Sequence, residues 1–286
     1  MAGNPVRRQA REWQRETDGG GAVSQDLEMP IVVTGMARSG TTWVQWFLSE
    51  HPRIHIHGQE PKLHWADLWH WYQKLVEHGR WAVRANRLQG YGVPHYAGSG
   101  PHRCREIFKR LVREYMTGLG PPVEAKPRWG LKWIGLAARG EAAWQFASLW
   151  PEARWVVCVR EPFAAMASLK NTFAPELDVR QFAASWVATC RFIEACDRGR
   201  LAVVQLDKLA GEGQAGRKAG LDEVLECVGE EPSEETDEFI RQWPVVHKVK
   251  PDEERSFRFT GEEKQRLVAE VPGLAEQMEK MGHGWE

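Results

Sequence analysis

The chain has 286 residues, of which 42% are hydrophobic and 27% are charged, as expected for a globular protein that buries a full core. Its 38 Lys and Arg residues nearly balance 39 Asp and Glu residues, and the formal net charge is -1. This balance argues against a nucleic-acid binder driven by bulk electrostatics, so we expect no nucleic-acid partner.

Cysteine usage and the N-terminal residues bear on where the protein works. The five cysteines form no Cys-x-x-Cys pair and are odd in number, which argues against a zinc site or a disulfide framework and favours a reducing compartment. Residues 1–28 are polar, basic and then Gly-rich, which predicts a mobile tail without a secretory signal. Because no apolar run could span a bilayer, we expect a cytoplasmic protein with no membrane partner.

The predicted elements alternate between strands and helices from residue 31 onward. Short β-branched or alternating runs predict strands at 31–35, 53–57, 128–135, 153–160 and 200–206. Helical spacing predicts helices at 41–51, 63–81, 102–119, 141–150, 161–170, 178–199, 219–229, 233–242 and 261–281, with a Gly- and Pro-rich loop at 86–101. We therefore expect one α/β domain over residues 29–286, with three layers around a central parallel sheet.

GMARSGTTW, residues 35–43, joins the first strand to the first helix and looks like a phosphate-binding loop without its lysine. Gly35 and Gly40 have the P-loop spacing and Thr42 takes the Ser/Thr place, but Thr41 stands where the lysine belongs. Backbone N–H groups and the helix start favour an anion here. The side chains that can add donors are Arg38, Ser39, Thr41 and Thr42.

The strand at 153–160 ends in Arg160, where an ATP-using enzyme would be expected to carry a magnesium-binding acid. A cation in this place favours a second phosphate site over a metal site. An ATP-dependent small-molecule kinase of the same fold remains the alternative, and both Thr41 and Arg160 argue against it.

Two motifs resemble those of the sulfotransferase family. RSGTTW, residues 38–43, resembles its 5′-phosphosulfate loop, which reads KSGTTW in cytosolic members, and residues 155–170 resemble its 3′-phosphate element, with Arg160 and Ser168 at the matching places. The resemblance implies an α/β fold like that of P-loop nucleotide kinases, the donor 3′-phosphoadenosine 5′-phosphosulfate used without a metal, and Trp43 stacked on adenine. Helical spacing places Trp46 in the core. The donor-binding residues that it implies are Arg38, Ser39, Gly40, Thr41, Thr42, Trp43, Arg160, Ser168, Lys248 and Lys250.

The resemblance also assigns catalytic roles. Lys132 matches a lysine on the third strand that stabilises the leaving group together with Arg38, and a lysine inside so apolar a strand is costly unless it has a partner. The histidine base of the cytosolic members is replaced here by Ile134, which cannot accept a proton. HGQEPKLHW, residues 57–65, resembles the segment of heparan and protein-tyrosine sulfotransferases that carries a glutamate base. We expect Glu60 to be the base, with His64 and then His57 as alternatives.

The acceptor is not identified by the sequence. Trp65, Trp69 and Tyr72 share one helical face, which is either core or the wall of an acceptor pocket, while Trp71 points elsewhere. We expect sulfuryl transfer to a hydroxyl, in preference to an amine, of a small-molecule, carbohydrate or natural-product acceptor. A catalytically inactive nucleotide-binding relative is a further alternative, and whether the chain forms a homodimer stays open.

Overall fold

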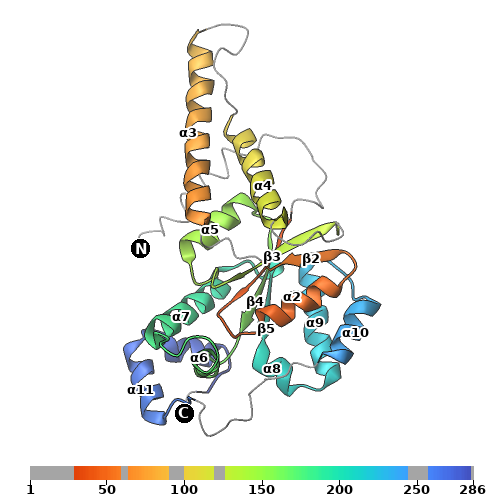
Figure 1. Cartoon of the computed structure of the whole chain (residues 1–286), viewed down its shortest axis with the longest axis vertical. Helices are drawn as coiled ribbons and strands as arrows, with labels where there is room; N and C mark the ends of the chain where they lie inside the picture. The colour runs from red at the N-terminus through yellow and green to blue at the C-terminus, as the bar shows by residue number, and fades with distance from the viewer. Residues whose placement is uncertain (1–28, 59–63, 90–99, 119–125, 244–256, 285–286) are drawn as a thin grey trace.

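A computed structural model describes residues 29–58, 64–89, 100–118, 126–243 and 257–284 (Figure 1). Its centre is a five-stranded sheet in the order β2-β3-β1-β4-β5, and all four pairings are parallel. The strands are β1 (Ile31–Gly35), β2 (Ile54–His57), β3 (Arg128–Ile134), β4 (Arg154–Val159) and β5 (Leu201–Gln205). The expected α/β fold with a parallel sheet is confirmed. The predicted tail, residues 1–28, lies outside the described residues.

Helices cover both faces of the sheet and make the three layers. One face packs against α2 (Thr41–Glu50), α9 (Gln214–Val228) and α10 (Glu234–Gln242). The other face packs against a larger set, which includes α5 (Gly140–Leu149), α6 (Pro162–Lys170) and α7 (Val179–Ala195). Successive strand residues alternate between the two cores, with Val32 in one and Val33 in the other, because a strand has a period of two.

The register places the end of β1 at the centre of the sheet's carboxyl edge. Gly35 pairs with Ile134 of β3 on one side and with Cys158 of β4 on the other. Ligands of open α/β sheets bind outside the carboxyl ends of the strands. The loop that follows β1 therefore lies where such a ligand would be expected.

The aromatic face of α3 (Trp65–Gln89) belongs to the core. Trp65, Trp69 and Tyr72 are buried against α4 (Pro101–Gly118) and α5, and Trp65 Nε1 donates to Gln145 Oε1 at 2.7 Å. Trp71 is 46% exposed, as its position on the helix predicts. The core interpretation of this face is therefore the correct one. Figure 1 shows α3 and α4 side by side, extending together away from the sheet.

Several helix boundaries differ from the predictions. The predicted helix at 261–281 is two helices, α11 (Gly261–Glu270) and α12 (Leu274–Lys280), because Pro272 and the left-handed Gly273 (φ 85°) interrupt it. The helix at 63–81 continues as α3 to Gln89, and the predicted 178–199 helix ends at Ala195, before the short 3₁₀ helix η3 (Arg198–Arg200). A short helix that was not predicted, α8 (Leu206–Gly211), follows β5. No helix of the described ranges is long and apolar enough to cross a membrane.

A buried ion pair joins the amino-terminal edge of the sheet to the end of α9. Arg128 Nη1 lies 3.0 Å from Glu230 Oε1, and the two side chains are only 6% and 7% exposed. Arg128 Nη2 also donates to the carbonyl oxygen of Val228 at 2.9 Å, and the exposed Arg53 contacts the second oxygen of Glu230. Charges this well buried are tolerated because each has a partner.

Replacing Glu230 by alanine should lower the free energy of unfolding by about 3 kcal/mol, because Arg128 would stay buried without its counterion. The matched control is Glu77→Ala, which removes the exposed Lys74–Glu77 pair and should cost about 0.5 kcal/mol or less. Urea unfolding of both variants measures the difference. Equal small losses would contradict a structural role for the buried pair.

Candidate functional site

The turn between β1 and α2 depends on its two glycines. Gly35 has a φ of 146°, and a Cβ atom there would lie 2.2 Å from the carbonyl oxygen of Cys158. Gly40 has a φ of 92°, and its Cβ would lie 2.6 Å from a methyl carbon of Leu206 at the start of α8. Glycine is required at both places, because the turn is packed closely between β4 and α8.

The start of α2 is suited to bind an anion. Among the described residues no side chain caps this helix, and its first turn contains no acid. The starts of α5 and α9 also lack a side-chain cap, whereas α10 and α11 begin with reciprocal side-chain caps, made by Ser233 with Thr236 and by Thr260 with Glu263. An uncapped, acid-free helix start directs N–H groups and the positive end of the helix dipole at a ligand.

The hydroxyl residues of the turn have different surroundings. Ser39 is buried, and its Oγ donates to the carbonyl oxygen of Met36 at 2.7 Å, so it braces the turn. Thr41 is buried too, whereas Thr42 is exposed and accepts a hydrogen bond from Lys132 Nζ at 3.2 Å. Thr42 is therefore the predicted hydroxyl that faces the end of β3.

Lys132 reaches across from β3 to the first turn of α2. Its side chain is half-buried on the same sheet face as α2, and it contacts Thr42 there. A cation beside the positive end of a helix dipole is unfavourable by itself. A bound anion would attract both the lysine and the positive end of the helix dipole. The placement of Lys132 therefore favours an anion between this lysine and the turn.

Arg38 connects the two motifs that resemble phosphate-binding elements. Its backbone is left-handed (φ 68°), which is uncommon outside glycine, and its Nε donates to Ser168 Oγ on α6 at 3.0 Å. Its guanidinium also lies over the ring of Phe173, 5.4 Å from the centroid. The two motifs, 130 positions apart in the chain, thus form one surface.

Arg160 lies beneath this surface, at the end of β4. Its Nη1 lies 3.5 Å from the carbonyl oxygen of Arg38, and its own carbonyl accepts from Trp186 Nε1 at 3.0 Å. Its Nε lies 3.4 Å from Asp207 Oδ1, an ion pair that is too long for a strong hydrogen bond. Sequence reasoning missed Asp207, because this residue lies in neither of the two motifs that resemble phosphate-binding elements.

Trp43 lies at the border between the core and the surface. Its ring is parallel to Phe47 with centroids 6.2 Å apart, and its Nε1 donates to the carbonyl oxygen of Trp243 at 3.3 Å. The Trp43 side chain is half-buried, and its stacking on an adenine stays a prediction. The expectation for Trp46 was wrong, since this side chain is 51% exposed. The buried positions of α2 are Thr41, Val44, Phe47 and Leu48, which places Trp46 off that face.

Only two of the three candidate bases are described. Glu60 lies outside the described residues. His64 is exposed at the start of α3, with its ring 6.3 Å from that of Tyr115. His57 ends β2, and burial, with the neighbouring His55 ring as a smaller cause, lowers its pKa from 6.5 to about 4. His57 is therefore uncharged at neutral pH, as a base must be, but it is a weak base.

The lowered pKa of His57 predicts a loss of stability in mild acid. The unfolded chain binds a proton at this ring below about pH 6.5, whereas the folded chain does so only below about pH 4. The free energy of unfolding should therefore fall as the pH falls from 6.5 to 4. Urea unfolding across this range should show a shallower fall for His57→Gln. An identical pH dependence in the variant would contradict the burial of the ring.

The predicted donor-binding residues Lys248 and Lys250 lie outside the described residues. The chain on either side of 244–256 is held beside the site. The carbonyl oxygen of Trp243 accepts from Trp43, and Phe257 exchanges two backbone hydrogen bonds with the Asn171 side chain, at 2.7 and 3.1 Å. Asn171 follows α6, three residues after Ser168.

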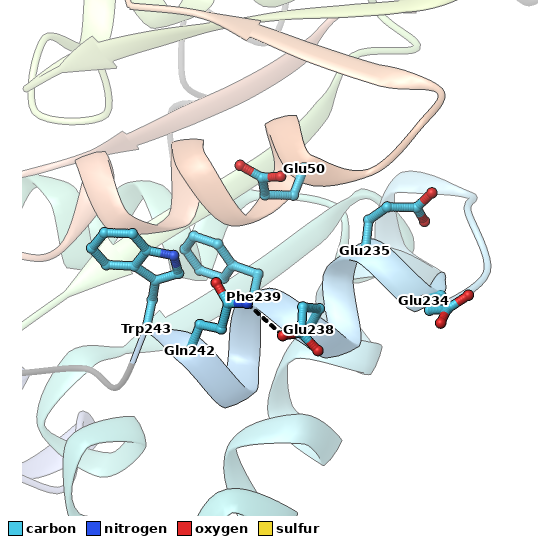
Figure 2. Close-up of a pocket in the computed structure, with 7 residues that line it drawn as sticks. All are labelled: Glu50, Glu234, Glu235, Glu238, Phe239, Gln242 and Trp243. Atoms are coloured by element: carbon cyan, nitrogen blue, oxygen red, sulfur yellow. Dashed lines mark hydrogen bonds between the residues drawn. The ribbon is translucent and has the colours of Figure 1, made fainter.

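A surface pocket of about 470 Å³ lies between α2 and α10 (Figure 2). It is lined by Glu50, Glu234, Glu235, Glu238, Phe239, Gln242 and Trp243. Four carboxyl groups would repel a phosphate, so this pocket does not suit the phosphate groups of a nucleotide. The turn after β1, with its cations and uncapped helix, remains the candidate site.

Comparisons with known proteins point to one family. A model described as "Sulfotransferase family" matches residues 30–207, which include the turn, Lys132, Arg160 and Ser168. The sulfotransferase domain of a Synechococcus olefin synthase is 15% identical, with a TM-score of 0.52 over 93% of this chain and 99% of that one. A sulfotransferase from Alicyclobacillus acidocaldarius is 13% identical, with a TM-score of 0.51 over 90% and 98%. Such low identities show the fold alone. A search of curated proteins gives no match.

Proposed function

The chain belongs to the sulfotransferase family, and we propose that it transfers a sulfuryl group from 3′-phosphoadenosine 5′-phosphosulfate to an acceptor hydroxyl. The observation that carries this donor assignment is the hydrogen bond between Arg38 Nε and Ser168 Oγ, at 3.0 Å. It joins two cation-bearing motifs into one surface, and the proposed donor has two separate phosphate groups.

The residues around the turn fit the proposed donor. The start of α2 and Lys132 would hold the 5′-phosphosulfate, and Arg160 with Ser168 would hold the 3′-phosphate. Arg38 belongs to the turn and its side chain contacts Ser168, so it would contact both phosphates. Trp43 would stack on the adenine. We also propose that residues 29–286 form a single domain around this site.

The bound donor supplies the sulfuryl group, which moves in line between two oxygens. Catalysis of such a transfer rests on positioning and on stabilising the charge that develops on the leaving group. Lys132 and Arg38 would supply that positive charge. Glu60 would take the proton of the acceptor hydroxyl, with His64 or His57 as the alternatives.

The acceptor would be a small molecule, a carbohydrate or a natural product. The aromatic face of α3 is occupied by the core, so Trp65, Trp69 and Tyr72 cannot wall an acceptor pocket. Phe173 is 71% exposed beside Arg38, and its ring is a candidate contact for an apolar part of the acceptor.

Calorimetric titration tests the donor assignment. We expect the protein to bind adenosine 3′,5′-bisphosphate equally well with and without EDTA, and to bind ATP with magnesium much more weakly. Radiolabelled sulfate donor can then be offered with a panel of phenols, sugars and alcohols. Binding of ATP with magnesium, together with no binding of the bisphosphate, would sink the donor assignment and favour a kinase.

A further inference from the structure

We infer that Asp207 is a positioning residue that holds Arg160 for the donor's 3′-phosphate and so sets the preference for a 3′,5′-bisphosphate; this inference rests on the proposed function. Asp207 is the second residue of α8, and its side chain is 33% exposed. An acid beside an anion site weakens anion binding by repulsion. Asp207 would therefore weaken donor binding unless it also assists the site in another way.

The two carboxylate oxygens of Asp207 contact consecutive residues where β4 turns into α6. Oδ1 lies 3.4 Å from Arg160 Nε, and Oδ2 accepts a hydrogen bond from the backbone N–H of Glu161 at 2.8 Å. The Glu161 side chain accepts from the N–H groups of Phe163 and Ala164 and so caps α6. Asp207 therefore fixes the start of the element that carries both Arg160 and Ser168.

The contact between Asp207 and Arg160 acts through charge. Arg160 Nε makes no hydrogen bond among the described residues, and the carboxylate attracts the guanidinium as an ion pair, which leaves the two Nη atoms for other partners. In Arg160 one of these atoms, Nη1, is directed towards the carbonyl oxygen of Arg38 in the phosphate-binding turn. Asp207 thus holds Arg160 beside the turn by charge attraction.

The short helix α8 also supports the turn itself. Leu206, next to Asp207 in the chain, fills the space beside Gly40, at 2.6 Å from where a Cβ would lie. Two adjacent residues of α8 therefore contact both the turn and the element with Arg160. The position of α8 would control the spacing of the two phosphate sites, of which a bisphosphate can fill both and a monophosphate only one.

The test is a pair of titrations, with adenosine 3′,5′-bisphosphate and with adenosine 5′-monophosphate. Asp207→Asn keeps an oxygen for the Glu161 N–H but loses the charge that holds Arg160. We expect it to lower the affinity ratio of bisphosphate to monophosphate by about 10-fold, with affinity for the monophosphate unchanged. The control is Asp222→Asn on α9, since Asp222 is equally exposed at 34% but pairs with Lys218. It should leave the ratio unchanged.

Three results would overturn the inference. One is an unchanged or larger ratio in Asp207→Asn, which would mean that the acid only repels the ligand. Another is an equal loss of affinity for both nucleotides, as a merely structural role would give. The third is the same fall in the ratio for Asp222→Asn. If Asp207→Asn does not fold, Asp207→Glu decides: a lower ratio supports the inference and an unchanged one overturns it.

Failure of the proposed donor would look different. The wild-type protein would then bind the bisphosphate no better than the monophosphate, before any variant is compared. That result would overturn the donor assignment and, with it, the role of Asp207.

Discussion

Lys132→Ala should lower kcat for sulfuryl transfer by roughly 100- to 1000-fold, the usual effect of removing one group that stabilises developing negative charge. The half-buried Lys132 reaches the first turn of α2, where the anionic donor would be bound. Its charge would gain most as the leaving group becomes more negative. The affinity for adenosine 3′,5′-bisphosphate should therefore fall much less than kcat. The measurement is steady-state kinetics with an acceptor found by the radiolabel screen.

A second lysine gives a matched control for this variant. Lys126 also reaches α2, but at its other end, where its Nζ donates to the carbonyl oxygens of Ser49 and His51 at 2.6 and 2.9 Å. Lys126→Ala should reduce stability, because these carbonyls lose a donor, and should leave kcat close to the wild-type value. If both variants lose turnover equally, Lys132 acts only by supporting α2.

The strands could be predicted from the sequence because their signal is local. Runs such as IVVTG are apolar on both sides, as a parallel strand covered by two helical layers must be, and each predicted strand was found within about two residues. The order of the strands was not predicted. Pairing β1 with both β3 and β4 depends on contacts about 100 residues apart, which leave no periodic pattern in the chain.

The errors in the helices have the same origin. Trp46 was assigned to the core on helical spacing, but the packing of α2 buries the face with Val44 and Phe47 instead. The helix α8 has only six residues and no clear pattern. Its position beneath Gly40 follows from where β5 ends, which only the folded sheet determines.

Individual residues of the candidate site were predicted, but the connections between them were not. The sequence placed Arg38 in one phosphate motif and Ser168 in another, and nothing in either motif indicates that the two side chains touch. Similarly, Asp207 had no predicted role until its carboxylate was found against Arg160. Residue types at fixed spacing reveal which groups can bind an anion, while their mutual geometry is a property of the fold.

The base is the assignment that now needs an experiment most. Glu60 lies outside the described residues, so its role rests on the family resemblance and on the replacement of the family's histidine by Ile134. A pH profile would not separate Glu60 from His57, because the pKa of His57 is about 4 and that of an ordinary glutamate is about 4.3. Both candidates would give an acidic limb at nearly the same pH. Substitution of each residue is the sharper approach.

Glu60→Gln should lower kcat by roughly 100-fold or more, the usual contribution of a general base, and should leave binding of adenosine 3′,5′-bisphosphate intact. His57→Gln and His64→Gln should change kcat by only a few-fold if Glu60 is the base. A large loss in one of the histidine variants, with Glu60→Gln active, would move the assignment to that histidine. If the wild-type protein shows turnover and Glu60→Gln loses it while still binding the nucleotide, a second alternative is excluded. The chain is then not a catalytically inactive nucleotide-binding relative.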